Sequence, residues 1–240
     1  MRETNLVYVA PIDGAMVEDA LPERAERSSG LFAWGMPRLR TRRFVLALLE
    51  PGFVFVGLPL LAINSAGGLT IPLIMMMMLS STAILLSATK SFHWSDLLPV
   101  EFWSEWRLMV GCSAAFALIA FTVTSLYWPS QLFSAPPEIA VMLIGFPILT
   151  ALPMELVYRA LFFRRYGHLI QGETAAIILG AAATSLGYAV LSGNNGGVIF
   201  GIALGGVLGW AYLKTGNFAV SVVLHWAAAA ALYLIGPGIL

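Results

Sequence analysis

Charged side chains are scarce in this chain of 240 residues. They make up 11% of the sequence, against roughly 25% in soluble domains, and apolar side chains make up 59%, against roughly 45–50%. A soluble globule needs more charge to cover its surface, and the mean hydropathy of +0.83 agrees with a lipid environment. The composition therefore excludes an ordinary soluble domain and predicts a protein that lies within a lipid bilayer.

Cysteine, histidine and net charge are also in short supply. The single cysteine, Cys112, excludes an internal disulfide and a cysteine-based zinc cluster. With three histidines in the sequence we expect no metal centre and no cofactor. The 13 basic side chains balance the 13 acidic ones, whereas a nucleic-acid-binding protein would carry a basic excess.

Much of the charge that is present lies at the start of the chain. Residues 1–43 hold 7 of the 13 bases and 6 of the 13 acids and show no sustained apolar period. We expect this segment to be a cytoplasmic, largely disordered tail with a short helix around Met16–Arg27. No short apolar core follows a basic N-terminal residue, so we expect the first apolar run to act as an uncleaved anchor.

The remainder, residues 44–240, reads as one transmembrane domain. A helix needs about 20 apolar residues to cross about 30 Å of hydrocarbon. Seven runs come close to that length: 44–63, 69–89, 108–128, 139–163, 174–191, 197–213 and 218–235. We therefore predict an all-α polytopic membrane helix bundle of about seven transmembrane helices.

Lysine and arginine lie in alternate connections between these runs. The connections that carry bases hold Arg38, Arg40, Arg42 and Arg43, then Lys90 and Arg107, then Arg164 and Arg165, and finally Lys214. The connections 64–68, 129–138 and 192–196 carry none. Because basic connections stay on the cytoplasmic side, the N-terminus is predicted to be cytoplasmic and the C-terminus outside. The tryptophan-rich segment 93–106 should then lie in the cytoplasmic membrane interface.

Four ionisable side chains lie inside the apolar runs. Placing a charged side chain at the bilayer centre costs at least about 2.5–3.5 kcal/mol, so each needs a partner or a water-lined cavity. Glu155 and Arg159 are four residues apart with the acid first, which favours an ion pair on one helix face. That pair is either a structural element or one wall of a polar cavity. Glu50 lies near a run end, where it can extend to the interface, and we assign it no chemistry.

The depths of Glu155 and His225 are similar. Glu155 lies eight residues from Phe163 and His225 seven residues from Phe218, both at predicted cytoplasmic ends. At 1.5 Å per residue both lie about 11–12 Å inside the membrane, so the two side chains could meet. The alternative is that His225 only makes a packing hydrogen bond. Our hypothesis is that they border one polar cavity open to the cytoplasmic side.

Glycine recurs at every fourth position of the sixth run. Gly197, Gly201, Gly205 and Gly209 place a bare backbone stripe along one helix face. Such a stripe predicts close approach of a neighbouring helix. In the cavity hypothesis, the same stripe would also form a wall of the polar site.

Three stretches together resemble a known family. Residues 152–163 resemble the first motif, Glu-Glu-x-x-x-Arg, of the CPBP (CAAX protease and bacteriocin-processing, or Abi) intramembrane proteases. Residues 184–192 resemble the second motif, Phe-x-x-x-His, and residues 222–229 the third, His-x-x-x-Asn/Asp. Order and spacing agree over about residues 100–235. The resemblance implies an intramembrane endopeptidase of a bacterial cytoplasmic membrane, acting on a prenylated or membrane-embedded peptide.

The resemblance also implies roles for individual residues. In the family, a first-motif Glu and the second-motif His activate a water, and the third-motif His and Asn bind the substrate carbonyl. Glu155 and His225 are accordingly the predicted catalytic residues, with Arg159, Tyr188 and Ser192 in supporting positions. One His and one Glu fall short of the three protein ligands usual for catalytic zinc.

The sequence departs from the family pattern at three polar positions. Met154 stands at the first Glu position, Ser192 at the second-motif His and Ala229 at the third-motif Asn. Losing a general base or an oxyanion donor costs a factor of about 10²–10⁴ each. Three alternatives therefore stay open: an active endopeptidase, a catalytically silent relative that binds a membrane peptide or partner protein, and a small transporter.

The place of Ser192 is a further open question. Counting along the fifth run puts it near the outer end, far from Glu155. Either that span is shifted, or the second motif does not reach the first.

Overall fold

The structure is helical throughout the part of the chain that it describes. This computed structural model describes residues 49–63, 70–89, 92–97, 102–134, 139–170, 172–192 and 195–235. Within those ranges there is no strand, so the predicted all-α class is confirmed. The predicted tail and its short helix around Met16–Arg27 lie outside the described residues.

Each of the seven predicted runs corresponds to a helical stretch. In chain order these stretches are a first helix with η1 (Phe53–Gly57) and α2 (Leu58–Ile63); α3 (Thr70–Ser87); α4 (Trp106–Tyr127); a composite helix of α5 (Ile139–Phe146), η5 (Pro147–Ala151), α6 (Leu152–Glu155) and η6 (Leu156–Tyr166); α7 (Glu173–Ser192); α8 (Asn195–Thr215); and α9 (Phe218–Ile235). Among the described residues, five helices are long and apolar enough to cross a membrane. Two further apolar helices, Leu49–Leu61 and Met76–Ser87, are shorter. The fold is that of a helical membrane bundle.

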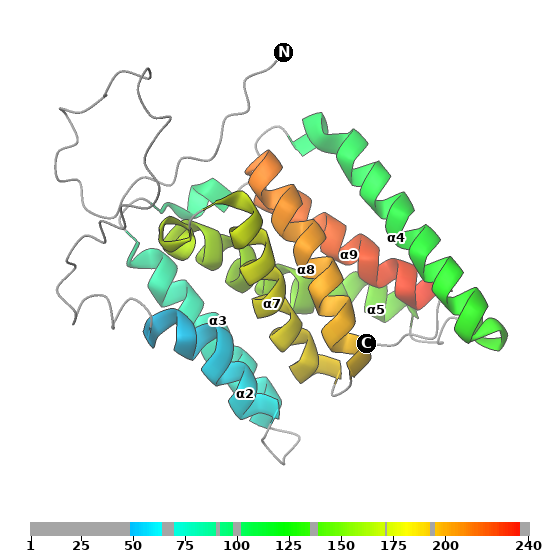
Figure 1. The fold of residues 1–240 in the computed structure, drawn as a ribbon, viewed down its shortest axis with the longest axis horizontal. Helices are drawn as coiled ribbons and strands as arrows, with labels where there is room; N and C mark the ends of the chain where they lie inside the picture. Colours follow the sequence, from blue (N-terminus) through cyan, green and yellow to red (C-terminus); the bar gives the residue numbers. More distant parts are fainter. Residues whose placement is uncertain are drawn as a thin grey trace, which may run out of the picture.

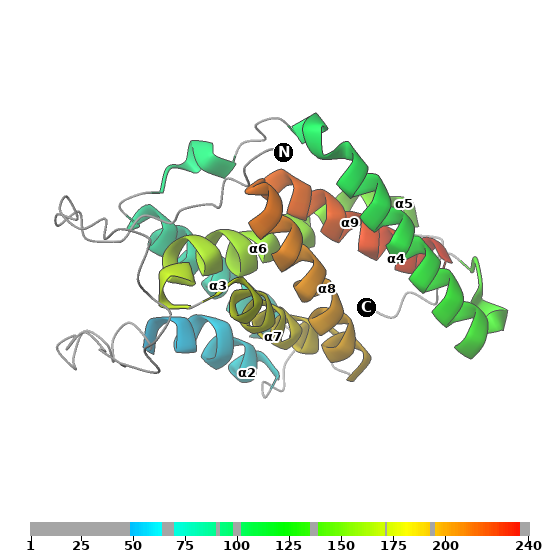
Figure 2. The same ribbon diagram turned by 45° about the horizontal axis from the view of Figure 1, so that its top comes forward.

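The helices pack as a layered bundle around the composite helix. α7 and α8 lie side by side near the middle, and α9 packs against α8 on one side and α4 on the other (Figure 1). α2 packs against α7, and α3 packs against η6 at the opposite edge from α4 (Figures 1 and 2). The composite helix contacts α3, α7 and α9, so first-motif side chains can face both later motifs.

The glycine stripe lies against α7. A Cβ at Gly201 would lie 2.7 Å from the Ser185 Cα, and one at Gly205 would lie 2.8 Å from the Ala181 Cα. With no side chains between them the two backbones approach closely, as predicted. The expectation that these glycines wall a polar cavity is wrong, because the α7 backbone fills the space beside them.

One proline inside the runs, Pro147, coincides with a π-helical turn. Pro147 begins η5 and has no N–H to bond the Leu143 carbonyl. The Trp226 indole N–H of α9 donates to that carbonyl at 2.9 Å instead. A neighbouring helix thus satisfies the freed backbone group, which is how proline is tolerated in membrane helices.

Three connections predicted to share one side of the membrane meet at one end of the bundle. The Arg165 guanidinium binds both Glu50 carboxylate oxygens, at 2.5 and 3.1 Å, and donates to the Thr89 hydroxyl at 3.0 Å. The Tyr166 hydroxyl also donates to Glu50, at 2.5 Å. Glu50, to which we assigned no chemistry, therefore joins the first helix to the end of η6, and Arg165 extends this network to Thr89, just beyond α3.

The tryptophan-rich segment lies at the same end. It forms two short 3₁₀ turns, η2 (Trp94–Leu97) and η3 (Phe102–Glu105), before α4. Asp96 of η2 lies 3.8 Å from Arg164, the neighbour of Arg165. Trp94 and Trp103 are exposed, as suits side chains at a membrane interface. Which side of the membrane this end faces stays a prediction.

Candidate functional site

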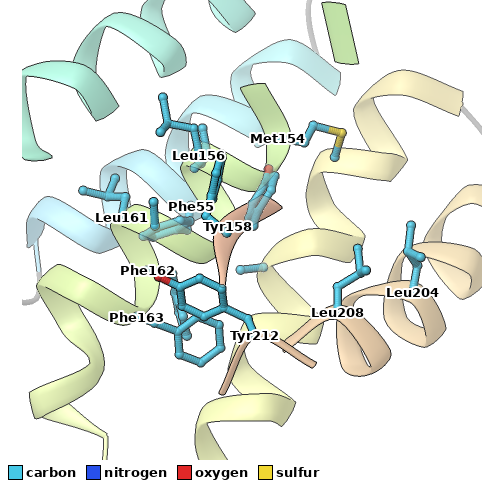
Figure 3. Packing of buried hydrophobic residues seen from close by; sticks show 14 of the residues in the cluster. Phe55, Met154, Leu156, Tyr158, Leu161, Phe162, Phe163, Leu204, Leu208 and Tyr212 are labelled. Atoms are coloured by element: carbon cyan, nitrogen blue, oxygen red, sulfur yellow. The ribbon is translucent and has the colours of Figure 1, made fainter. Parts of the chain in front are cut away.

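The first-motif helix runs through the interior of the bundle. Every side chain from Met154 to Phe163 is buried, and apolar neighbours from several helices surround them (Figure 3). Glu155 and Arg159 belong to this stretch, and each has 0% of its surface exposed. Two opposite charges in such surroundings require close partners.

Glu155 contacts His225 directly. The Glu155 Oε1 lies 2.9 Å from the His225 Nδ1, joining α6 to α9. The prediction that these two side chains meet is confirmed. Counting residues from the predicted cytoplasmic ends, Phe163 and Phe218, thus led to the correct contact.

Arg159 completes the charge balance of Glu155. Its Nε lies 3.2 Å from the Glu155 Oε2, which confirms the predicted ion pair within one helix. One guanidinium nitrogen, Nη1, donates to the Thr184 hydroxyl at 3.1 Å and to the Tyr158 carbonyl at 3.0 Å. Sequence reasoning missed Thr184; the available signal was its place one turn before Tyr188, on the same face of α7.

Tyr188 contacts the other nitrogen of His225. The Tyr188 hydroxyl oxygen lies 2.5 Å from the His225 Nε2, and both side chains are buried. The ring of Phe146 packs edge-on against the imidazole with the centroids 5.7 Å apart. The predicted supporting residues Arg159 and Tyr188 are thus both in the cluster around Glu155 and His225.

Charge balance assigns the protons in this network. An ionised Glu155 only accepts hydrogen bonds, so the His225 Nδ1–H donates to it. A neutral imidazole then presents Nε2 as an acceptor, and the Tyr188 O–H donates to it. With Arg159 positive and Glu155 negative, this neutral form of His225 keeps the buried set at zero net charge, which makes its burial least costly.

The three departures from the family pattern occupy different surroundings. Met154 and Ala229 are buried, with 2% and 1% of their surface exposed. Met154 lies in the apolar cluster with Tyr158, one turn along the same helix (Figure 3). Ser192 is the last residue of α7, one turn beyond Tyr188, and its side chain lies outside the described part of the structure.

The second-motif helix does reach the first motif. Tyr188 is 15 residues from the start of α7, whereas its partner His225 is seven residues from the start of α9. At 1.5 Å per residue these depths differ by about 12 Å, so α7 is shifted or tilted relative to α9. α7 therefore reaches the other two motifs through Thr184 and Tyr188, whereas the Ser192 side chain lies outside the described part of the structure and its distance from Glu155 stays a prediction.

The site is closed in this structure. Neither Glu155 nor His225 exposes any surface, so the expected opening toward the cytoplasmic side is not seen around these two residues. Apart from the ion-paired Glu155 Oε2 and Arg159 Nε, three buried polar atoms nearby have no hydrogen-bond partner: Arg159 Nη2, Tyr158 Oη and Ser221 Oγ. Within the described ranges no three His, Cys, Asp or Glu side chains gather where they could hold a metal ion.

Comparison with protein families gives a match for part of the chain. Residues 136–231 match the family model described as "Type II CAAX prenyl endopeptidase Rce1-like". No curated protein and no solved structure matches the chain. The matched segment contains all three motifs and lies within the predicted core of about residues 100–235. Over this segment the chain is similar to the Rce1-like type II CAAX prenyl endopeptidases, which confirms the suspected family.

Proposed function

We propose that this CAAX-protease-like membrane protein is catalytically silent and binds a membrane-associated peptide without cleaving it. The observation that supports this most is the closed hydrogen-bond network. Both nitrogens of His225 are engaged, by Glu155 at 2.9 Å and by Tyr188 at 2.5 Å. A water-activating base and an oxyanion donor must each offer a hydrogen-bonding atom to the reactants, and neither group does so here.

The apolar replacements point in the same direction. Met154 and Ala229 stand where the family has a Glu and an Asn, and both are packed in the interior. Neither side chain can accept a proton from water or donate to a developing oxyanion. Since each lost group costs a factor of about 10²–10⁴, the combined loss takes peptide hydrolysis below ordinary detection.

The binding part of the proposal follows from the family similarity and the membrane fold. The matching model describes prenyl endopeptidases, so the proposed ligand is a prenylated or membrane-embedded peptide. The proposed location is a bacterial cytoplasmic membrane. Five helices long and apolar enough to cross a bilayer are compatible with that setting.

The experiment compares cleavage and binding in one preparation. The purified protein in lipid nanodiscs is given a prenylated CAAX peptide with a photoreactive group, and cross-linking and mass of the peptide are both measured. We expect cross-linking without cleavage in the wild type. The triple reversion Met154→Glu, Ser192→His and Ala229→Asn should gain cleavage, and Glu155→Ala in that background should remove it.

An active endopeptidase is the second candidate. The Glu155–His225 contact favours it, since a carboxylate paired with an imidazole is a proton-transferring arrangement. Cleavage of the peptide by the wild-type protein that Glu155→Ala abolishes would establish this candidate and reject the silent one. Absence of both cleavage and cross-linking would reject the binding part.

A further inference from the structure

Tyr188 stands at a position where the family pattern has no hydroxyl. In the second motif, Phe-x-x-x-His, this chain has Tyr188 at the Phe position and Ser192 at the His position. The imidazole of the motif is therefore missing, and a phenolic hydroxyl is present one turn earlier on the same helix. That hydroxyl lies 2.5 Å from the His225 Nε2.

Packing holds the Tyr188 ring firmly in this position. The ring lies edge-on against Phe200 of α8, with centroids 5.1 Å apart. A Cβ at Gly201 would lie 2.9 Å from the Tyr188 Cβ, so the missing side chain at Gly201 makes room for the tyrosine. The side chain is 1% exposed. The hydroxyl is thus directed at His225 by the α7–α8 contact.

We propose that Tyr188 is an internal ligand of His225, occupying the imidazole nitrogen that a bound peptide carbonyl would need. This inference rests on the proposed catalytic silence and gives it a structural cause. The resemblance assigns carbonyl binding to the third-motif histidine, which here is His225. Its Nδ1 is held by Glu155, so Nε2 is the nitrogen left for a substrate, and Tyr188 takes it.

The hydrogen-bond directions make this occupation effective. With its proton on Nδ1, the neutral His225 has no N–H at Nε2 and cannot donate to a carbonyl oxygen. The Tyr188 O–H stabilises that same tautomer by donating to Nε2. A peptide carbonyl would have to displace the hydroxyl and also move the proton between the ring nitrogens. Tyr188 is therefore a positioning residue that keeps the site in its non-donating form.

The first test reads the imidazole directly. The full chain is labelled with ¹⁵N-histidine in lipid bilayers, and the His225 signals are identified among the three histidines by their loss in His225→Gln. We expect the wild type to show a protonated Nδ1 and an unprotonated Nε2. Tyr188→Phe should shift the Nε2 signal, while the matched control Tyr127→Phe, an exposed tyrosine at the end of α4, should leave it unchanged.

The outcomes of this test are decisive without any catalytic measurement. A wild-type His225 with its proton on Nε2 overturns the proposal, and this needs no variant to fold. An Nε2 signal that is the same in Tyr188→Phe as in the wild type overturns it too. If Tyr188→Phe instead disturbed the fold as a whole, the signals of His93 and His168 would also broaden or shift.

The second test uses the reverted site. Adding Tyr188→Phe to the triple reversion should raise cleavage of the prenylated peptide about tenfold, because the Tyr188 hydroxyl then no longer occupies the His225 Nε2 that the peptide carbonyl would contact. Equal cleavage with and without Tyr188→Phe overturns the inference while leaving the proposed silence intact. Cleavage by the wild type overturns the proposed silence, and the histidine signals then still report separately on the Tyr188 contact.

Discussion

A single residue, Glu155, carries the balance of the buried charges. It accepts from His225 through one oxygen and lies 3.2 Å from the Arg159 guanidinium through the other. Removing one member of a buried ion pair leaves the other charge without compensation, which is more costly than removing both. The stability of the bundle should therefore depend on Glu155 whether or not the site is catalytic.

The first prediction concerns the neutral variant of this residue. Glu155→Gln should destabilise the protein by about 3–5 kcal/mol, because Arg159 remains charged and buried. The double variant Glu155→Gln/Arg159→Gln should recover part of that loss. Unfolding in detergent measures both effects, with Glu173→Gln at the exposed start of α7 as control. If the Glu155→Gln protein is as stable as the control, the Glu155–Arg159 ion pair does not contribute to the free energy of unfolding in this way.

The ionisable residues of the site could be predicted from the sequence, but their polar partner Thr184 could not. Glu155, Arg159 and His225 could be identified because a charge or an imidazole in an apolar run needs a partner. Thr184 gave no such signal, since a threonine hydroxyl in a helix usually bonds its own backbone, and Thr184 does donate to the Gly180 carbonyl at 2.7 Å. Its second role as acceptor for Arg159 depends on helix placement, which one sequence does not reveal.

At the scale of elements, the α7–α8 contact positions the second motif. The glycine stripe lets the two backbones approach, and this approach places Tyr188 against Phe200 and His225. The spacing of glycines was sufficient to predict the close contact. It did not reveal which helix would be the partner. The expected cavity wall was wrong because a stripe of small residues lets a neighbouring helix pack directly against it, which leaves no opening there.

The second prediction tests this contact with two alanine substitutions on one helix. Gly201→Ala should destabilise the bundle by about 1–3 kcal/mol, because its Cβ would meet the Ser185 backbone at 2.7 Å. Gly206→Ala is the matched control, since a Cβ there has no atom within 4 Å. It should be neutral or stabilising by about 0.5–1 kcal/mol, the usual gain of alanine over glycine in a helix. Equal unfolding temperatures for the two variants would contradict close packing at Gly201.

At the scale of the whole molecule, several contacts gather the predicted cytoplasmic connections at one end. Arg165 joins Glu50 to Thr89, and Arg164 lies near Asp96 and donates to the Tyr212 hydroxyl at 3.3 Å. The alternation of basic connections predicted that these segments share a side. Their individual pairings could not be predicted, because residues 115 positions apart, such as Glu50 and Arg165, meet only once the bundle is assembled.

The third prediction decides which side of the membrane this end faces. Ser95 and Ser130 are exposed and flank α4, one on the basic connection and one on the connection without bases. In a Cys112→Ala background, Ser95→Cys should resist a membrane-impermeant maleimide in intact cells and react in inverted vesicles, whereas Ser130→Cys should do the reverse. The reason is that arginine and lysine near a span end hold that end in the cytoplasm. The cysteine-free parent measures background labelling. If Ser95→Cys reacts in intact cells and Ser130→Cys only in inverted vesicles, the predicted orientation is reversed while the bundle stands. If both positions are labelled from the same side, α4 does not cross the membrane, and the predicted order of spans is wrong.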